Sequence, residues 1–63
     1  MKIENYAQLR NEMDMVDGNM ARMCITSSIE ELEGMLYYAL ERINAIYNYN
    51  LKRLKANEEK NQF

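Results

Sequence analysis

The stretch MLYYALERINAIYNYN (Met35–Asn50) decides how this chain folds. Its sixteen residues include five large aliphatic side chains and four tyrosines, more than one buried helix face requires. Large residues recur every three or four positions from Leu36 through Leu40 and Ile43 to Tyr47, which is the spacing of a single helix face. The stretch therefore predicts a helix with one core-facing stripe and a surplus of large side chains elsewhere.

The start of this helix is marked by serines. Either Ser27 or Ser28 suits the N-cap position, because a glutamate follows each of them three residues later. Acidic residues cluster near this start and basic residues near the far end, an order that the helix dipole favours. We expect the helix to span about 28–55, after a turn over about 24–27, and we expect residues 56–63 to form a frayed tail.

The first half of the chain repeats the same helical spacing. Its apolar residues are three or four positions apart throughout, which predicts a helix over about 3–23. Gly18 lies in a turn-like Asp-Gly-Asn triplet, but the pattern resumes in phase after it, so we expect one continuous helix. Met15 points away from the predicted seam, which consists of Tyr6, Leu9, Met13, Val16, Met20 and Met23.

The short connection predicts that the two helices fold back as an antiparallel hairpin in a single all-α domain. Counting outward from the turn pairs the two seams, and the second helix should extend beyond the first, so that Leu51 and Leu54 have no intramolecular partner. The expected pairs are Met23 with Ile29, Met20 with Leu32, Val16 with Leu36, Met13 with Leu40, Leu9 with Ile43, and Tyr6 with Tyr47.

Such a hairpin leaves each seam half exposed, and the chain has few other means of stabilising itself. It has 63 residues, no histidine and one cysteine, so an internal disulfide or a zinc site is not expected. We therefore expect a homodimeric four-helix bundle. Asn50 either pairs with its symmetry mate or lies where the helix frays into solvent. The predicted oligomer interface comprises Leu36, Leu40, Ile43, Tyr47, Asn50, Leu51 and Leu54.

A second stripe follows the opposite side of the same helix. It mixes aromatic, small and basic residues, including Ala45, and tyrosine and arginine are enriched at protein interfaces. The stripe is either a surface for another protein, a self-interface, or a set of exposed tyrosines without a role. Under the first interpretation, the residues that bind the target are Tyr38, Arg42, Tyr49 and Arg53.

Composition also bears on chemistry and location. Without histidine, and with Cys24 expected to be a small buried hydrophobe, the sequence predicts no catalytic site, no cofactor and no metal site. No apolar run approaches the roughly 20 residues of a membrane span. A lone cysteine favours a reducing cytoplasm, and a net charge of −2 gives no global electrostatic reason to expect nucleic acid as a partner.

We therefore expect a non-catalytic regulator, adaptor or inhibitor that binds an unidentified protein, the kind of small chain that bacteria and mobile elements, including phages, often encode. An alternative is an RNA-binding four-helix bundle, since the predicted architecture is similar to that of the small plasmid regulators of the Rop type, although no sequence motif matches. The RNA-contacting residues would then be Arg42, Lys52, Arg53 and Lys55. A third alternative is an accessory subunit whose seam a larger partner completes.

Overall fold

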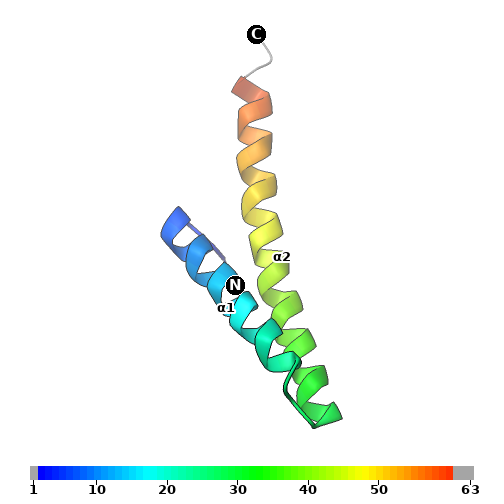
Figure 1. Ribbon diagram of the computed structural model, residues 1–63. Coiled ribbons are helices and arrows are strands. Elements are labelled where there is room, and N and C mark those ends of the chain that lie inside the picture. Colours follow the sequence, from blue (N-terminus) through cyan, green and yellow to red (C-terminus); the bar gives the residue numbers. More distant parts are fainter. Residues whose placement is uncertain (1, 61–63) are drawn as a thin grey trace.

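The computed structural model of the chain describes residues 2–60, excluding the side chains of the last two. Within that range there are two helices, α1 (Tyr6–Met23) and α2 (Ile29–Lys60), and no strand. They pack against each other as a hairpin joined by residues 24–28, and α2 continues far beyond the start of α1 (Figure 1). The predicted all-α hairpin is therefore confirmed.

The start of α1 is fixed by a reciprocal pair of side-chain bonds. Asn5 is the N-cap, and its side-chain oxygen accepts a hydrogen bond from the backbone N–H of Gln8 at 2.9 Å. The Gln8 side chain in turn accepts from the backbone N–H of Glu4 at 2.7 Å. The helix therefore begins three residues later than predicted. It runs unbroken through Gly18, as predicted.

The start of α2 has the expected serine cap. The Ser28 hydroxyl accepts a hydrogen bond from the backbone N–H of Glu31 at 3.2 Å, and the Glu31 carboxylate accepts from the Thr26 hydroxyl at 3.1 Å. At its other end α2 continues to Lys60. Residues 56–60, which were predicted to belong to a frayed tail, are therefore helical, and the prediction is wrong for them. The alanine, glutamates and lysine of this segment favour helix. Residues 61–63 of the predicted tail lie outside the described range.

The side of α2 that faces α1 differs from the prediction. Leu36, Leu40 and Tyr47, which were expected to close the hairpin, are 44%, 50% and 61% exposed. The buried residues of α2 are instead Ala39 and Ala45, which lie roughly 80° and 160° round the helix from the mean direction of those three residues. The predicted intramolecular pairing of bulky side chains is therefore wrong.

Small side chains explain this choice. An alanine lets the backbone of a neighbouring helix approach closely, so α1 can lie against Ala39 and Ala45 with its own buried residues Leu9 and Val16. Ile46 and Tyr49 pack beside this contact. The hairpin thus uses the narrow side of α2 and leaves the bulky side uncovered.

The level at which the two helices meet is close to the prediction. The side chain of Asn19, which is buried, donates to the backbone carbonyl of Met35 at 2.6 Å, and Arg42 forms an ion pair with Glu12. These contacts lie within about one helical turn of the predicted pairs. Counting outward from the turn therefore predicted the register, whereas the hydrophobic pattern predicted the wrong face.

The residues before α1 also contribute to the core. Ile3 is buried and packs with Leu9 and Ala45, while Ile46 and Tyr49 lie against this cluster. The N-terminal segment therefore covers part of α2 just beyond the end of α1. Further along α2 the side chain of Leu54 is exposed, as predicted, whereas that of Leu51 is half-buried.

Candidate functional site

A polar contact joins the two helices at mid-length. A guanidinium nitrogen of Arg42 donates to the carboxylate of Glu12, and the other terminal nitrogen donates to the Tyr38 hydroxyl. The Arg42 guanidinium also lies 4.1 Å from the centre of the Tyr38 ring. The hydrogen bond with Glu12 raises the pKa of Arg42, so this side chain stays charged. Because only 11% of the Arg42 side chain is exposed, it serves the hairpin itself.

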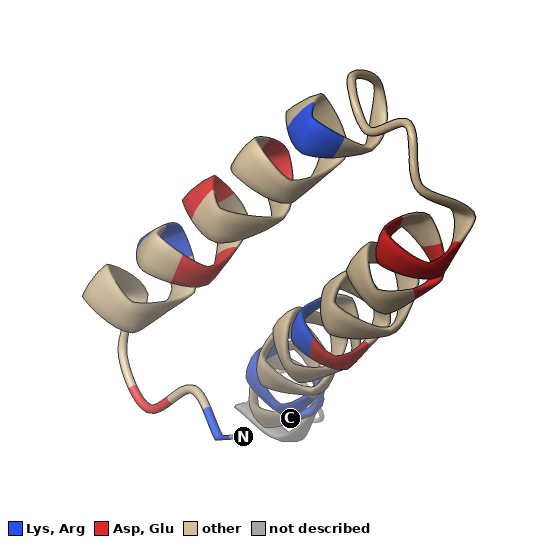
Figure 2. Cartoon of the chain, turned by 90° about the horizontal axis from the view of Figure 1, so that it is seen from below, with Lys and Arg blue, Asp and Glu red and all other residues tan. Residues whose placement is uncertain are grey.

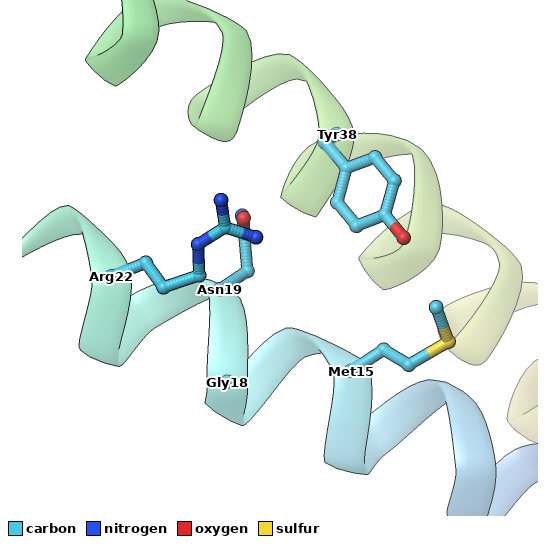
Figure 3. A pocket seen from close by; sticks show the side chains of 5 residues that line it. All are labelled: Met15, Gly18, Asn19, Arg22 and Tyr38. Carbon is cyan, nitrogen blue, oxygen red and sulfur yellow. The ribbon is translucent and has the colours of Figure 1, made fainter.

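A shallow groove lies beside this contact, between α1 and α2. It is lined by Met15, Gly18, Asn19 and Arg22 from α1 and by Tyr38 from α2 (Figure 3). Gly18 leaves open space where a side chain would stand, since nothing lies within 4 Å of an added Cβ. Figure 3 shows the Tyr38 ring and the side chains of Met15 and Arg22 around this opening. The groove therefore presents aromatic, thioether and cationic groups together.

A second groove lies at the other end of α1. Four residues of α2 and three N-terminal residues line it, one of them acidic: Tyr49, Lys52, Arg53 and Ala56, with Lys2, Ile3 and Glu4. Basic residues are found on α2 in this direction, whereas acidic residues gather at its start (Figure 2). The structure thus brings Lys2 next to two of the residues predicted to contact RNA, and it directs Arg42 to Glu12 instead.

The four residues predicted to bind a target do not form one open surface. They follow one side of α2, but α1 and the N-terminal segment lie against that side. Tyr38 and Arg42 are joined at the hairpin contact. Tyr49 is half-buried beside Ile3, and Arg53 is exposed and donates to the Asn50 side chain at 3.3 Å. Tyr38 lines the first groove, and Tyr49 and Arg53 line the second.

A continuous set of large exposed apolar side chains covers another side of the hairpin. We call it the apolar face. In each helix the mean direction of its members lies roughly 70–120° round from that of the residues that touch the other helix. In both helices this offset has the same sense when each is viewed along its own axis from the N-terminus. Because the helices are antiparallel, equal senses of rotation place both sets on the same side of the hairpin. That side is opposite the first groove. The apolar face comprises Tyr6, Met13 and Met20 of α1 and Leu32, Leu36, Leu40, Ile43 and Tyr47 of α2.

The structure places most of the predicted oligomer interface on or near this apolar face. Leu36, Leu40, Ile43 and Tyr47 belong to it, and Leu51 and Leu54 continue its line along the free end of α2. Asn50 is engaged within its own helix, where its side-chain nitrogen donates to the carbonyl of Ile46 at 2.9 Å. A pairing of Asn50 with its symmetry mate stays a prediction.

Other chemistry is sparse in the described part of the chain. Cys24 is exposed at the C-cap of α1, in the turn before α2, so its expected burial is wrong. Residues 2–60 contain no group of three or more acidic, histidine or cysteine side chains placed to hold a metal ion. Neither described helix is long and apolar enough to cross a membrane.

Sequence reasoning missed two features that position these surfaces, the Asn19 hydrogen bond and the cap formed by Asn5 and Gln8. Asn19 was assigned only to a turn-like triplet, although an asparagine at a helical position of the hairpin contact can bond to the neighbouring backbone. The Asn5–Gln8 cap was overlooked too, although an N-cap residue followed three positions later by glutamine is its usual sign.

Comparison with known proteins supplies no family. No protein-family model matches the chain, and no curated protein and no solved structure matches it.

Proposed function

We propose that this chain is a small non-catalytic protein that acts by binding another protein, as a regulator, adaptor or inhibitor, in the form of a homodimeric four-helix bundle. One observation carries the proposal. Fourteen large apolar side chains are exposed among the described residues, eight of them on the apolar face, whereas no large side chain there is fully buried. A monomeric soluble protein seldom exposes so much apolar surface in one area.

Self-association supplies the missing core. Two helices can bury only the strip along which they touch, here mostly alanine, valine and leucine. Covering the apolar face with a second hairpin removes leucine, isoleucine and methionine side chains from water and produces the closed layer of a four-helix bundle. The oligomer residues of this proposal are therefore those of the apolar face, continued by Leu51 and Leu54.

The first groove is the surface that we assign to the target. It lies on the side opposite the apolar face, so it stays accessible when two hairpins pack together. Tyrosine, arginine and methionine are enriched at protein interfaces, and Tyr38, Arg22 and Met15 line this groove. The lone exposed thiol of Cys24 suits a reducing compartment, so we place this activity in the cytoplasm.

Affinity capture from lysate with quantitative mass spectrometry tests the proposal. Tyr38→Ala with Arg22→Ala should reduce capture of the target at least about tenfold, the loss of about 1.4 kcal/mol of binding. Tyr37→Ala is the matched control, since Tyr37 is an exposed tyrosine on the same helix turn outside the groove. Sedimentation must show that each variant keeps the wild-type mass.

Two results would contradict the proposal. Equal capture of the target by the wild type and by the groove variant would show that the first groove does not bind the target. A wild-type chain that is unfolded in isolation and becomes helical only with a larger partner would identify an accessory subunit instead. In that case the apolar face belongs to the partner and the homodimer is abandoned.

RNA binding is a second candidate, favoured by one specific observation. Lys2 joins Lys52 and Arg53 around the second groove, with Tyr49 available for stacking. Phosphate contacts of this kind are salt-dependent, so binding to a structured RNA should weaken by about tenfold or more between 50 and 200 mM salt. Affinity that does not change with salt would rule this candidate out.

A further inference from the structure

We propose that the apolar face joins two copies of this chain about one two-fold axis, with α2 antiparallel to the partner's α2 and α1 antiparallel to the partner's α1. This inference rests on the self-association proposed above and specifies its geometry. In such an isologous interface, if residue i of one subunit contacts residue j of the other, then residue j of the first also contacts residue i of the second. The spacing of large residues along each helix must therefore be the same when it is read from either end.

The apolar stripe of α2 has this property. Its large residues follow one another at intervals of 3, 4, 4, 3, 4, 4 and 3 positions, which is the same sequence of intervals from either end. The intervals 3, 4 and 4 add up to a repeat of eleven residues, which is close to three full turns of an α-helix. The stripe therefore runs nearly parallel to the helix axis and stays in contact with a straight neighbouring helix. The stripe comprises Ile29, Leu32, Leu36, Leu40, Ile43, Tyr47, Leu51 and Leu54.

Antiparallel pairing about the middle of this stripe gives a partner to every member. Ile29 and Leu32 lie against Leu54 and Leu51 of the partner subunit, and Leu36 and Leu40 against the partner's Tyr47 and the partner's Ile43. The free end of α2, which has nothing to pack against in its own hairpin, is thereby covered by the start of the partner's α2. The 78% exposure of Ile29 in the single chain is explained in the same way.

The second helix pair is centred on the same axis, which is an independent observation. The residues of α1 on the apolar face are Tyr6, Met13 and Met20, evenly spaced about Met13, whereas the exposed Met15 lies on the opposite side, in the first groove. The α2 stripe is centred between positions 41 and 42, and Arg42 is bonded to Glu12, next to Met13. The two centres therefore lie at one level of the hairpin, and one two-fold axis serves both helices.

Charge selects the antiparallel arrangement over a parallel one. The start of α2 carries Glu30, Glu31 and Glu33, and its far part carries Lys52, Arg53 and Lys55 (Figure 2). Antiparallel packing puts the acidic end of one α2 beside the basic end of the other and opposes the helix dipoles. Parallel packing would bring together ends of like charge.

Disulfide cross-linking tests this geometry in a Cys24→Ser background. Single cysteines are introduced near the proposed axis by Met13→Cys or Leu40→Cys, and far from it by Leu32→Cys. The two near-axis variants should form covalent dimers readily under mild oxidation. Leu32→Cys should not, because its two copies would be about 28 Å apart along the bundle, well beyond disulfide reach. Leu32→Cys mixed with a tagged Leu51→Cys chain should give the mixed disulfide.

The possible results separate this inference from the proposed function. Efficient self-cross-linking of Leu32→Cys by a chain that sediments as a dimer would show a parallel dimer, which overturns the geometry and leaves self-association intact. Cross-linking of neither near-axis variant, in dimers of wild-type mass, would mean that the apolar face is not the interface. A monomeric wild-type chain would overturn both proposals together.

Discussion

The two sides of α2 differ in the size of their residues and in what covers them. One side carries Ala39 and Ala45, and α1 lies against it with the Arg42–Glu12 ion pair at its centre. The other carries Leu36, Leu40 and Tyr47, which remain about half exposed among the described residues. The small side lets the two helices of one hairpin approach closely, and the bulky side is left for contacts between hairpins.

The comparison shows that hydrophobicity and burial within a chain are separate properties. The bulky side has the larger apolar area, yet the hairpin forms on the alanine side, where backbones come close and polar bonds can fix the register. Large side chains contribute most to the free energy of folding when neighbouring residues surround them and remove them from water. A two-helix hairpin alone has too few neighbours to surround them. Substitutions on the two sides should therefore have different consequences.

The largest effect is expected from a charge on the bulky side. Leu40→Glu would place two carboxylates in the dimer core, and a buried charge without a partner is strongly destabilising. The dissociation constant of the dimer should rise by at least about 100-fold, equivalent to about 2.8 kcal/mol, and helicity should fall with it. Sedimentation and circular dichroism on one dilution series measure both quantities.

Ile25→Glu is the control for that substitution. Ile25 is 83% exposed but lies in the connection between the helices, away from the apolar face. Its replacement should leave the dimer unchanged. Similar losses from both substitutions would mean that exposed apolar residues matter for a general reason such as solubility.

A smaller effect is expected from enlarging the alanine side. Ala45→Leu would insert a bulky side chain where α1 and the N-terminal segment lie close, and over-packing of this kind typically costs about 1–3 kcal/mol. Urea denaturation at fixed protein concentration measures the loss. Ala56→Leu, on the exposed free end of α2, should be nearly neutral, and equal losses at both positions would show that the side of α2 is not what matters.

Removing the charge at the hairpin contact should have a lesser effect. Glu12→Gln keeps the shape of the side chain but deprives Arg42 of its anionic partner. The midpoint of thermal unfolding should fall, by less than in Ala45→Leu, while the dimer mass is retained. Combining Glu12→Gln with Arg42→Gln in a double-mutant cycle should give a non-additive result, and strict additivity would show that the two residues do not interact.

The smallest effect is a gain in stability. Gly18→Ala adds a methyl group to an open position in the middle of α1, where glycine is less favourable than alanine by up to about 1 kcal/mol. Gly34→Ala should give a similar gain, since nothing lies within 4 Å of an added Cβ there either. Thermal unfolding at matched concentrations measures both. A loss of stability in Gly18→Ala would indicate a neighbour that occupies the groove in solution.

The sequence was sufficient to predict the elements that depend on local signals. The Ser28 cap, the continuity of α1 through Gly18 and the level at which the helices meet all follow from neighbouring residues and connection length. The start of α1 was also encoded locally, in Asn5 and Gln8, and was overlooked.

The face of α2 that packs against α1 was a different kind of problem. Periodicity identifies the stripes of a helix but not which of them meets the neighbouring helix, because that choice depends on side-chain volume across two helices at once. Arg42 illustrates the difficulty. It was assigned to a binding surface because arginine is enriched at protein interfaces. Its burial against Glu12 depends on the position of α1, which the pattern of one helix does not reveal. Ile3 was assigned to a helix, and its packing on Ala45 depends equally on tertiary contacts.

The most direct test of the central claim, that the bulky side of α2 is covered by a second copy of the chain, is sedimentation equilibrium of the wild-type chain followed by circular dichroism at each dilution. The account predicts twice the 7.5 kDa chain mass at micromolar concentration, with mass and helicity falling together on further dilution. A fully helical species of 7.5 kDa at micromolar concentration would contradict it.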